Sequence, residues 1–162
     1  MNLGLIVKEL GLSQRSYYAT RNMNLAARFN LVNDCCIFWE QVSPSFFKTI
    51  FSTMNSSEIW EFNGTLISTC VSTTLTAQKA VNSSKRFFYV WDLEWMRRYK
   101  GRNVDYNYNI EAFTDKDTPL IARSKSHANA IKNYCNRDVC GIVEDFNIDQ
   151  IKEIFNNDPR NQ

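Results

Sequence analysis

The sequence lacks most of the features that mark the commoner classes of enzyme and nucleic-acid-binding protein. It contains a single histidine, which excludes metal ligation by two histidines. Its 19 basic and 17 acidic residues give a net charge of +2, so no electrostatic case exists for a dedicated nucleic-acid or anionic-membrane binder. It also has no H-E-x-x-H, no G-x-S-x-G and no kinase signature. Zinc-enzyme, serine-hydrolase and kinase functions are therefore unsupported, and we expect no metal site.

Signals for membrane insertion and secretion are missing as well. No apolar run is long enough to cross a bilayer, and the N-terminus lacks the basic, apolar and cleavage segments of a secretory signal. The five cysteines include no C-x-x-C pair, and four lie in apolar runs, where a free thiol behaves as a small hydrophobe: Cys35, Cys36, Cys70 and Cys140. We therefore expect a cytoplasmic protein with reduced cysteines and no membrane span.

The hydrophobic pattern predicts one α/β domain over residues 1–156, followed by a polar tail over 157–162. Short apolar segments, typical of buried strands, alternate with segments of helical spacing. The predicted strands are 3–7, 35–39, 66–70, 86–90, 119–123 and 139–143; the predicted helices are 13–29, 72–81, 93–99, 124–134 and 147–155. This alternation favours a doubly wound, mainly parallel sheet of about six strands with helices on both faces, a Rossmann-like fold.

Two segments are harder to interpret. Residues 45–62 have helical spacing at Phe46, Phe47, Ile50 and Phe51, which predicts a helix, and a second short helix is expected from Ser57. Residues 101–117 alternate polar and apolar side chains with a period of two. That period indicates an edge strand or an extended loop over the sheet, long enough to be a functional excursion.

The stretch from 86 to 95 is the most informative part of the chain. Its first half is rich in aromatic and β-branched residues, and its second half places Asp92 and Glu94 where the strand should end. Ligands of open α/β sheets bind outside the carboxyl ends of the strands, so these carboxylates are the candidate catalytic residues. In the alternative interpretation, Asp92 caps the next helix and Glu94 is solvated in its first turn.

Other polar residues should gather at the same edge of a parallel sheet. These candidate substrate-binding residues follow the other strands: Gly11, Ser13, Glu40, Arg123, Ser124 and His127. Carboxylates accept hydrogen bonds from hydroxyl groups and tryptophan faces cover the apolar side of a sugar ring, so this edge suits a hydroxyl-rich ligand. Paired carboxylates could also perform acid–base chemistry or hold a divalent metal. Structural helix caps are the competing explanation for most of these residues.

The sequence around Gly11 and around His127 further limits the roles that these two candidates can have. The turn at Gly11 lacks the G-x-G-x-x-G and G-x-x-x-x-G-K-[ST] spacings, so it is either a plain connecting turn or a simple anion site at a helix N-terminus. His127 falls in the first turn of its helix, where a positive charge is disfavoured. We therefore expect a neutral, hydrogen-bonding histidine.

Four stretches together resemble the N-terminal Rossmann-like half of GT-B glycosyltransferases, notably those of bacteriophages. They are residues 11–13 with Tyr17 and Tyr18, residues 88–95 (F-Y-V-W-D-L-E-W), residues 122–127 (A-R-S-K-S-H) and residues 142–147 (I-V-E-D-F-N). The resemblance extends from Leu3 to about Phe155, and the W-D-L-E-W segment is its most distinctive part.

The resemblance implies a contribution to the transfer of a sugar from a nucleotide-sugar to an acceptor, in the host cytoplasm if the chain is of phage origin. Enzymes of this type have a second domain that binds most of the donor nucleotide, and this chain does not contain it. The expected partners are thus a separately encoded donor-binding domain and a sugar or glycan, with no tightly bound cofactor and the nucleotide-sugar as donor substrate. The alternative is a non-catalytic α/β module that binds a sugar, a nucleotide or a protein.

Overall fold

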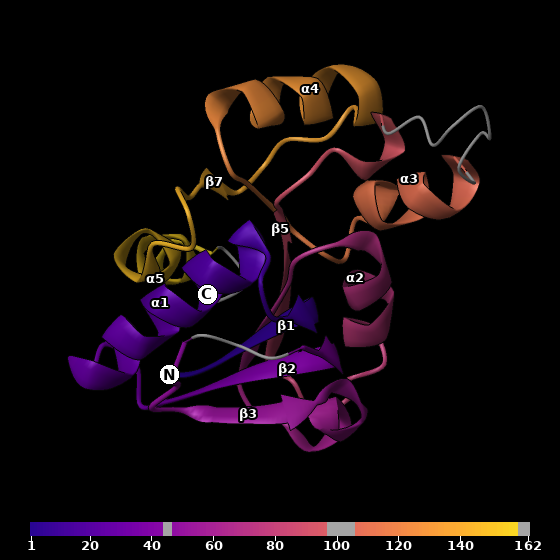
Figure 1. Ribbon diagram of the computed structural model, residues 1–162. Helices are drawn as coiled ribbons and strands as arrows, with labels where there is room; N and C mark the ends of the chain where they lie inside the picture. Colours follow the sequence, from indigo (N-terminus) through magenta and orange to yellow (C-terminus); the bar gives the residue numbers. More distant parts are fainter. Residues whose placement is uncertain (44–46, 97–105, 159–162) are drawn as a thin grey trace.

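The computed structural model describes residues 1–43, 47–96 and 106–158, which build a single parallel sheet covered by helices (Figure 1). The sheet has seven strands in the order β3-β2-β1-β4-β5-β6-β7, and every neighbouring pair is parallel. The strands are β1 Asn2–Leu10, β2 Asp34–Val42, β3 Ser52–Asn55, β4 Thr65–Ser68, β5 Lys85–Val90, β6 Leu120–Ala122 and β7 Gly141–Ile142. The predicted doubly wound, Rossmann-like α/β fold is confirmed.

Helices cover both faces of the sheet. They are α1 Gln14–Arg28, α2 Val71–Ala77, α3 Tyr106–Thr114, α4 Lys125–Cys135 and α5 Ile148–Asn156, with short 3₁₀ turns η1 at Ser56–Glu61 and η2 at Glu94–Met96. Figure 1 shows α1 and α5 on one side of the sheet and α2 and α3 on the other. Successive β1 side chains alternate accordingly: Leu5 and Val7 pack in the core under α1 and α5, and Ile6 packs in the core under α2.

Three predicted helix starts are confirmed by their caps. The side chain of Ser13 accepts a hydrogen bond from the N–H of Ser16 at 3.1 Å, and that of Ser124 accepts from the N–H of His127 at 3.2 Å. Asn147 caps α5 in the same manner. Each cap satisfies an N–H that has no acceptor within its own helix, which is why Ser and Asn at these positions were informative.

The prediction for residues 101–117 is wrong over the part that the structure describes. Residues 106–114 form the helix α3, not an edge strand or an extended loop, and residues 101–105 lie outside the described residues. Asn109, Ala112 and Phe113 are buried, and their i, i+3, i+4 spacing places them on the helix face that meets the sheet. The alternation of Asn with larger residues hid this face.

The prediction of a helix over 45–62 is also wrong for the described part. Residues 44–46 lie outside it, and residues 52–55 form the edge strand β3, paired with β2. The sequence S-T-M-N gives no apolar signal because three of its four side chains are exposed. The short helix expected from Ser57 is the 3₁₀ turn η1, capped by Asn55 and anchored by the buried Ile59. Of the helix expected over 93–99, only η2 is described.

Within the described residues, no helix is both long enough and apolar enough to cross a membrane. The five cysteines are free thiols. Burial, with a further contribution from Asp34, raises the pKa of Cys35 to about 11 and that of Cys36 to about 12. These two thiols are therefore protonated and unreactive at neutral pH.

Candidate functional site

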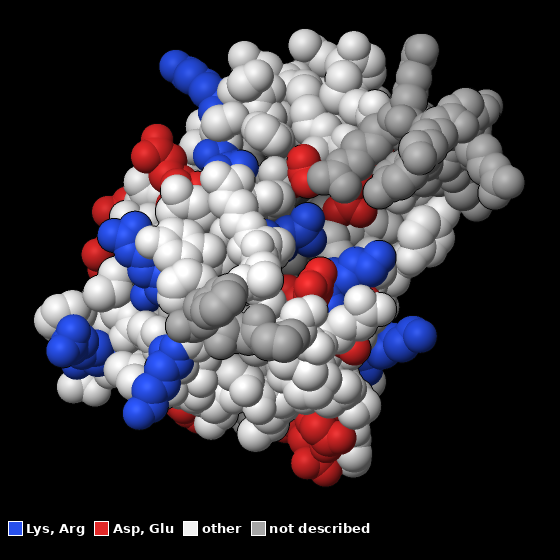
Figure 2. Space-filling view, in the orientation of Figure 1, with Lys and Arg blue, Asp and Glu red and all other residues white. Residues whose placement is uncertain are grey.

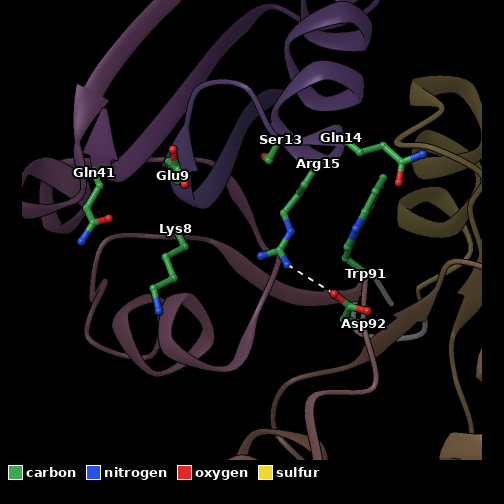
Figure 3. A pocket seen from close by; sticks show the side chains of 8 residues that line it. All are labelled: Lys8, Glu9, Ser13, Gln14, Arg15, Gln41, Trp91 and Asp92. Atoms are coloured by element: carbon green, nitrogen blue, oxygen red, sulfur yellow. Dashed lines mark ion pairs between the residues drawn. The ribbon is translucent and has the colours of Figure 1, made fainter. Parts of the chain in front are cut away.

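The strand connections reverse direction between the paired strands β1 and β4. The chain leaves β1 through α1 toward β2 on one side, and leaves β4 through α2 toward β5 on the other. Connections that depart in opposite directions leave a crevice at the carboxyl ends of such strands. A pocket of about 310 Å³ lies there (Figure 3), lined by Lys8, Glu9, Ser13, Gln14, Arg15, Gln41, Trp91 and Asp92. The fold thus places the predicted Ser13 and Asp92 around one hollow.

The loop after β1 is closed by its own side chains. The Ser16 hydroxyl donates to the carbonyl of Glu9 at 2.5 Å and accepts from the N–H of Gly11 at 3.2 Å. A Cβ on Gly11 would lie 2.8 Å from the Cβ of Ser43, and the Ser43 hydroxyl donates to the Glu9 carboxylate at 2.7 Å. Gly11 therefore allows two loops to approach closely, and it does not line the pocket. This arrangement matches the interpretation of the segment as a connecting turn.

Two cationic side chains enter the pocket. Arg15, at the second position of α1, has its Nη2 3.8 Å from Oδ2 of Asp92, which follows β5. Lys8 is exposed and forms no ion pair with any residue that the structure describes. Figure 3 shows the ends of Lys8 and Arg15 on the same side of the pocket, with Asp92 beside the guanidinium. The pocket therefore combines positive charge with a carboxylate that can accept a hydroxyl proton.

This charge is a local feature. In the space-filling view of Figure 2, acidic and basic side chains are interspersed over the visible face, without a broad area of one sign. Glu9 and Asp92 balance Lys8 and Arg15 around the same hollow. A ligand of this site would therefore be recognised at short range by individual groups, not by long-range attraction to a charged surface.

The structure separates the two predicted catalytic carboxylates. Asp92 lines the pocket, whereas Oε1 of Glu94 accepts a hydrogen bond from the N–H of Val71 at 3.1 Å, at the start of α2. A carboxylate there is stabilised by the helix N-terminus, so Glu94 helps to cap α2. It caps α2, not the helix in whose first turn we expected it to be solvated.

Glu40 is not among the residues that line the pocket. It is half-buried within β2, which continues to Val42 instead of ending at Glu40 as predicted. Burial raises the pKa of Tyr108 on α3, and the charges of Cys70, Glu40 and Glu94 raise it further. Glu40 and Glu94 therefore share a neighbourhood beside α3.

Trp91 cannot stack on a sugar ring with either face. The Arg123 guanidinium lies 3.8 Å above the indole centre, and Phe146 is stacked with the indole at 5.3 Å and an angle of 10°. The residue is only 6% exposed, and Figure 3 shows its ring edge-on beside the pocket. The expectation that a tryptophan face covers a sugar fails for Trp91, which offers only a ring edge.

A strained turn holds this stack in place. Asp145 and Phe146 have φ angles of 46° and 61°, in the left-handed region that residues with a Cβ seldom adopt. The amide of Asn22 on α1 donates to the carbonyl of Asp145 at 2.6 Å, and Asp145 accepts from Arg123 at 3.0 Å. The turn therefore positions Phe146 against the tryptophan and Asp145 against the arginine.

Ser124 and His127 form a pair beside Arg123, at the start of α4. The Ser124 hydroxyl lies 2.8 Å from Nδ1 of His127. Burial lowers the pKa of His127, and the charge of Arg123 lowers it further, while Asp92 acts in the opposite direction. The expectation of a neutral, hydrogen-bonding histidine agrees with this direction, although burial is the leading cause and not the helix N-terminus alone.

Sequence reasoning missed Lys8, Arg15 and Gln41. Each is a polar residue on a surface position of a strand or helix, a pattern that normally means solvation. Their convergence depends on the lateral order of β2, β1, β4 and β5, and the sequence does not encode that order in any local signal. Among the described side chains, no group of three His, Cys, Asp or Glu residues could hold a metal ion.

Comparison with protein-family models, with curated proteins and with solved structures gave no match to this chain.

Proposed function

We propose that this chain is a Rossmann-like binding module whose pocket at the carboxyl end of the sheet holds a small, hydroxyl-rich ligand of the sugar or nucleotide class. The observation that carries the proposal is the convergence of Lys8, Arg15, Gln41 and Asp92 on one hollow from four separate elements of the fold. The hollow lies where the strand connections reverse direction, which is where doubly wound sheets bind their ligands.

The donor and acceptor groups of the pocket fit such a ligand. Asp92 keeps a third of its side chain exposed, at 34%, and can accept hydrogen bonds from hydroxyl groups. Gln41 is exposed on the opposite side and can both donate and accept. With Trp91 offering an edge only, recognition relies on hydrogen bonds and charge.

An amide-resolved NMR titration tests this proposal. Glucose, uridine and UDP-glucose are added separately to the labelled protein, and at least one is expected to shift the backbone signals of the pocket residues. Arg15→Gln should weaken that binding, while Arg21→Gln, an exposed arginine on the same helix, should leave it unchanged. If none of the three compounds shifts a pocket signal at millimolar concentration, the proposal is wrong.

A second candidate, favoured by a separate observation, is that the chain is the N-terminal half of a GT-B glycosyltransferase. Leu12 and Val42 are 65% and 58% exposed, and each is next in sequence to a residue that lines the pocket. Exposed apolar side chains beside a polar pocket suit the docking of another domain. In this proposal a separately encoded domain binds the nucleotide-sugar donor, and Asp92 acts on the acceptor hydroxyl as general base.

Co-purification from the native cell tests this second candidate. The full chain should retain a partner with a nucleotide-sugar-binding domain, and the variant Leu12→Asp/Val42→Asp should lose it. Val81→Asp is the matched control, because Val81 is 79% exposed in a turn that does not line the pocket. Retention of the same partner by the double variant would refute docking at this rim.

A further inference from the structure

We infer that the ligand of the pocket is a compact phosphomonoester of a hydroxylated ring, such as a hexose phosphate or a mononucleotide, held by the side chains of Lys8 and Arg15. This inference rests on the proposed binding function and narrows the class of ligand. It excludes a dinucleotide held by the backbone of the first loop, which is the usual arrangement for doubly wound sheets.

The volume of the pocket sets the first limit. Small-molecule sites span roughly 300–1,000 Å³. The pocket here, at about 310 Å³, lies at the lower end of this range. A single ring with one phosphate matches this size, whereas two nucleosides joined by a pyrophosphate would extend well beyond the lining residues.

The glycine side of the first loop is closed to a pyrophosphate. Its backbone N–H groups at Gly11 and Ser16 already donate to the hydroxyls of Ser16 and Ser13. Ser43 lies against Gly11, so the space that a dinucleotide phosphate would need next to the glycine is filled by protein. The close backbone approach at the glycine on which dinucleotide loops depend is therefore absent, and the charged contacts fall to the side chains that line the pocket.

Two cations are available for one phosphate. Lys8 has no ion-pair partner in the described parts of the chain, and Arg15 is 3.8 Å from Asp92, beyond a normal hydrogen-bond distance. A phosphate between them would gain charge-assisted hydrogen bonds from both side chains. The charge of a dianion matches one lysine and one arginine.

The carboxylates limit the ligand to a single phosphate. Glu9 and Asp92 line the remainder of the same hollow, so a second phosphate would lie close to one of these negative charges. A ring hydroxyl in that position would instead donate to a carboxylate oxygen. The pocket therefore places an anionic group beside Lys8 and Arg15 and hydroxyl groups beside Asp92.

The experiment compares five probes on the whole chain by NMR titration: glucose, glucose 1-phosphate, uridine 5′-monophosphate, inorganic phosphate and NAD⁺. We expect either phosphomonoester, or both, to bind about tenfold or more tightly than the other three. Glucose lacks the two charge-assisted contacts, inorganic phosphate lacks the ring hydroxyls that face Asp92, and NAD⁺ exceeds the volume of the pocket. The tighter of the two phosphomonoesters identifies the ring, a hexose or a nucleoside. Lys8→Met should remove this advantage, and Lys79→Met, another exposed lysine, should preserve it.

Each other outcome rejects the inference. Equal binding of glucose or NAD⁺ in the pocket would show a polar-ligand site without phosphate selectivity, so the proposed function would stand and the inference would fail. Inorganic phosphate binding as tightly as the esters would show a plain anion site. If Lys8→Met bound the phosphomonoester as tightly as the natural chain does, Lys8 would not hold the phosphate and the inference would be wrong. If no probe, and neither uridine nor UDP-glucose, shifted a pocket signal, the inference and the proposed function would both be wrong.

Discussion

The two ends of the sheet each carry a polar hollow, and they differ in how their side chains are used. At the amino end, a hollow of about 480 Å³ is lined by Gln78, Arg86, Glu111, Thr114, Asp115, Asp117 and Thr118. At the carboxyl end, the hollow is about 310 Å³. The larger hollow is more acidic and would attract attention first if volume and charge alone identified a site.

The polar groups of the amino end are bonded to one another. Asp115 accepts hydrogen bonds from Gln78 at 2.9 Å, from Thr118 at 2.7 Å and from the N–H of Asp117 at 2.9 Å. Burial alone would raise the pKa of this carboxyl, but these bonds outweigh it and lower the pKa below its ordinary value. Arg137 donates to the carbonyls of residues 113, 115 and 118, which fixes the connection from α3 to β6.

At the carboxyl end, the two cationic side chains are less tightly paired. Lys8 has no ion pair among the described residues, and the contact of Arg15 with Asp92 is long, at 3.8 Å. An ion pair this long, between side chains that are 18% and 34% exposed, contributes about 1 kcal/mol, so a ligand can replace it at small cost. The two hollows therefore differ in their cations: Arg137 is held by three carbonyls near the amino end, whereas Lys8 has no ion pair among the described residues at the carboxyl end.

Arg137→Met, at the amino end of the sheet, is expected to have the largest effect and tests the difference between the two hollows. It should lower the free energy of unfolding by about 2 kcal/mol, because the hydrogen bonds of a half-buried charged group to three carbonyls are lost. Urea denaturation measures this change. Ligand binding at the carboxyl end should be unaffected; weaker binding by a variant that is folded would show that the two hollows are coupled.

Arg15→Gln should show the opposite behaviour. Its affinity for the ligand should fall about tenfold, equivalent to about 1.4 kcal/mol, because a charge-assisted contact is lost. Its stability should change by no more than about 1 kcal/mol, since the ion pair of Arg15 is long and glutamine retains part of the packing of this 18%-exposed side chain. Calorimetric titration and urea denaturation of the same preparation separate the two effects. A large loss of stability would place Arg15 among the structural residues.

Ser124→Ala tests the contribution of Ser124 as the N-cap of α4. Loss of the N-cap should lower the free energy of unfolding by about 1 kcal/mol. The alanine also removes the hydroxyl 2.8 Å from Nδ1 of His127. Ser124→Asn retains a capping side chain and serves as the control for helix stability. If Ser124→Ala were as stable as the natural protein, the cap would contribute little.

The smallest effect concerns pH. His127 has a lowered pKa in the folded state, so the unfolded chain binds more protons near its ordinary value of 6.5. The contribution of His127 to the free energy of unfolding is therefore fully present above pH 6.5. It is lost as the pH falls through the pKa that His127 has in the folded state. His127 is the only histidine, so its ring proton signals can be followed by NMR without assignment problems. A midpoint above 6.5 would contradict the burial of a neutral ring.

The sequence predicted the elements that have strong local signals. The apolar strand at 86–90 and the caps Ser13, Ser124 and Asn147 produce these signals, because burial and capping act over a few residues. The polar strand β3 and the helix α3 were missed. An exposed edge strand needs no apolar side chains, and alternating asparagines imitate the period of a strand.

The site was predictable only where it coincides with the end of a strand. Asp92 was found because it follows a buried strand, and Glu94, two residues later, was assigned to the same site although it caps α2. Lys8 and Arg15 carry no distinguishing pattern, since solvated charges are common on any surface. The closure of the first loop depends on the contact of Gly11 with Ser43, residues distant in sequence, which no local pattern reveals.

The most direct measurement is an NMR titration of the whole chain with glucose 1-phosphate in which the amide signals of both hollows are followed. The account predicts shifts at Glu9, Gln14, Arg15 and Asp92, with no change at Gln78, Asp115 and Thr118. Shifts confined to the amino-end residues would contradict it, because the ligand would then occupy the hollow that we assign to the fold alone.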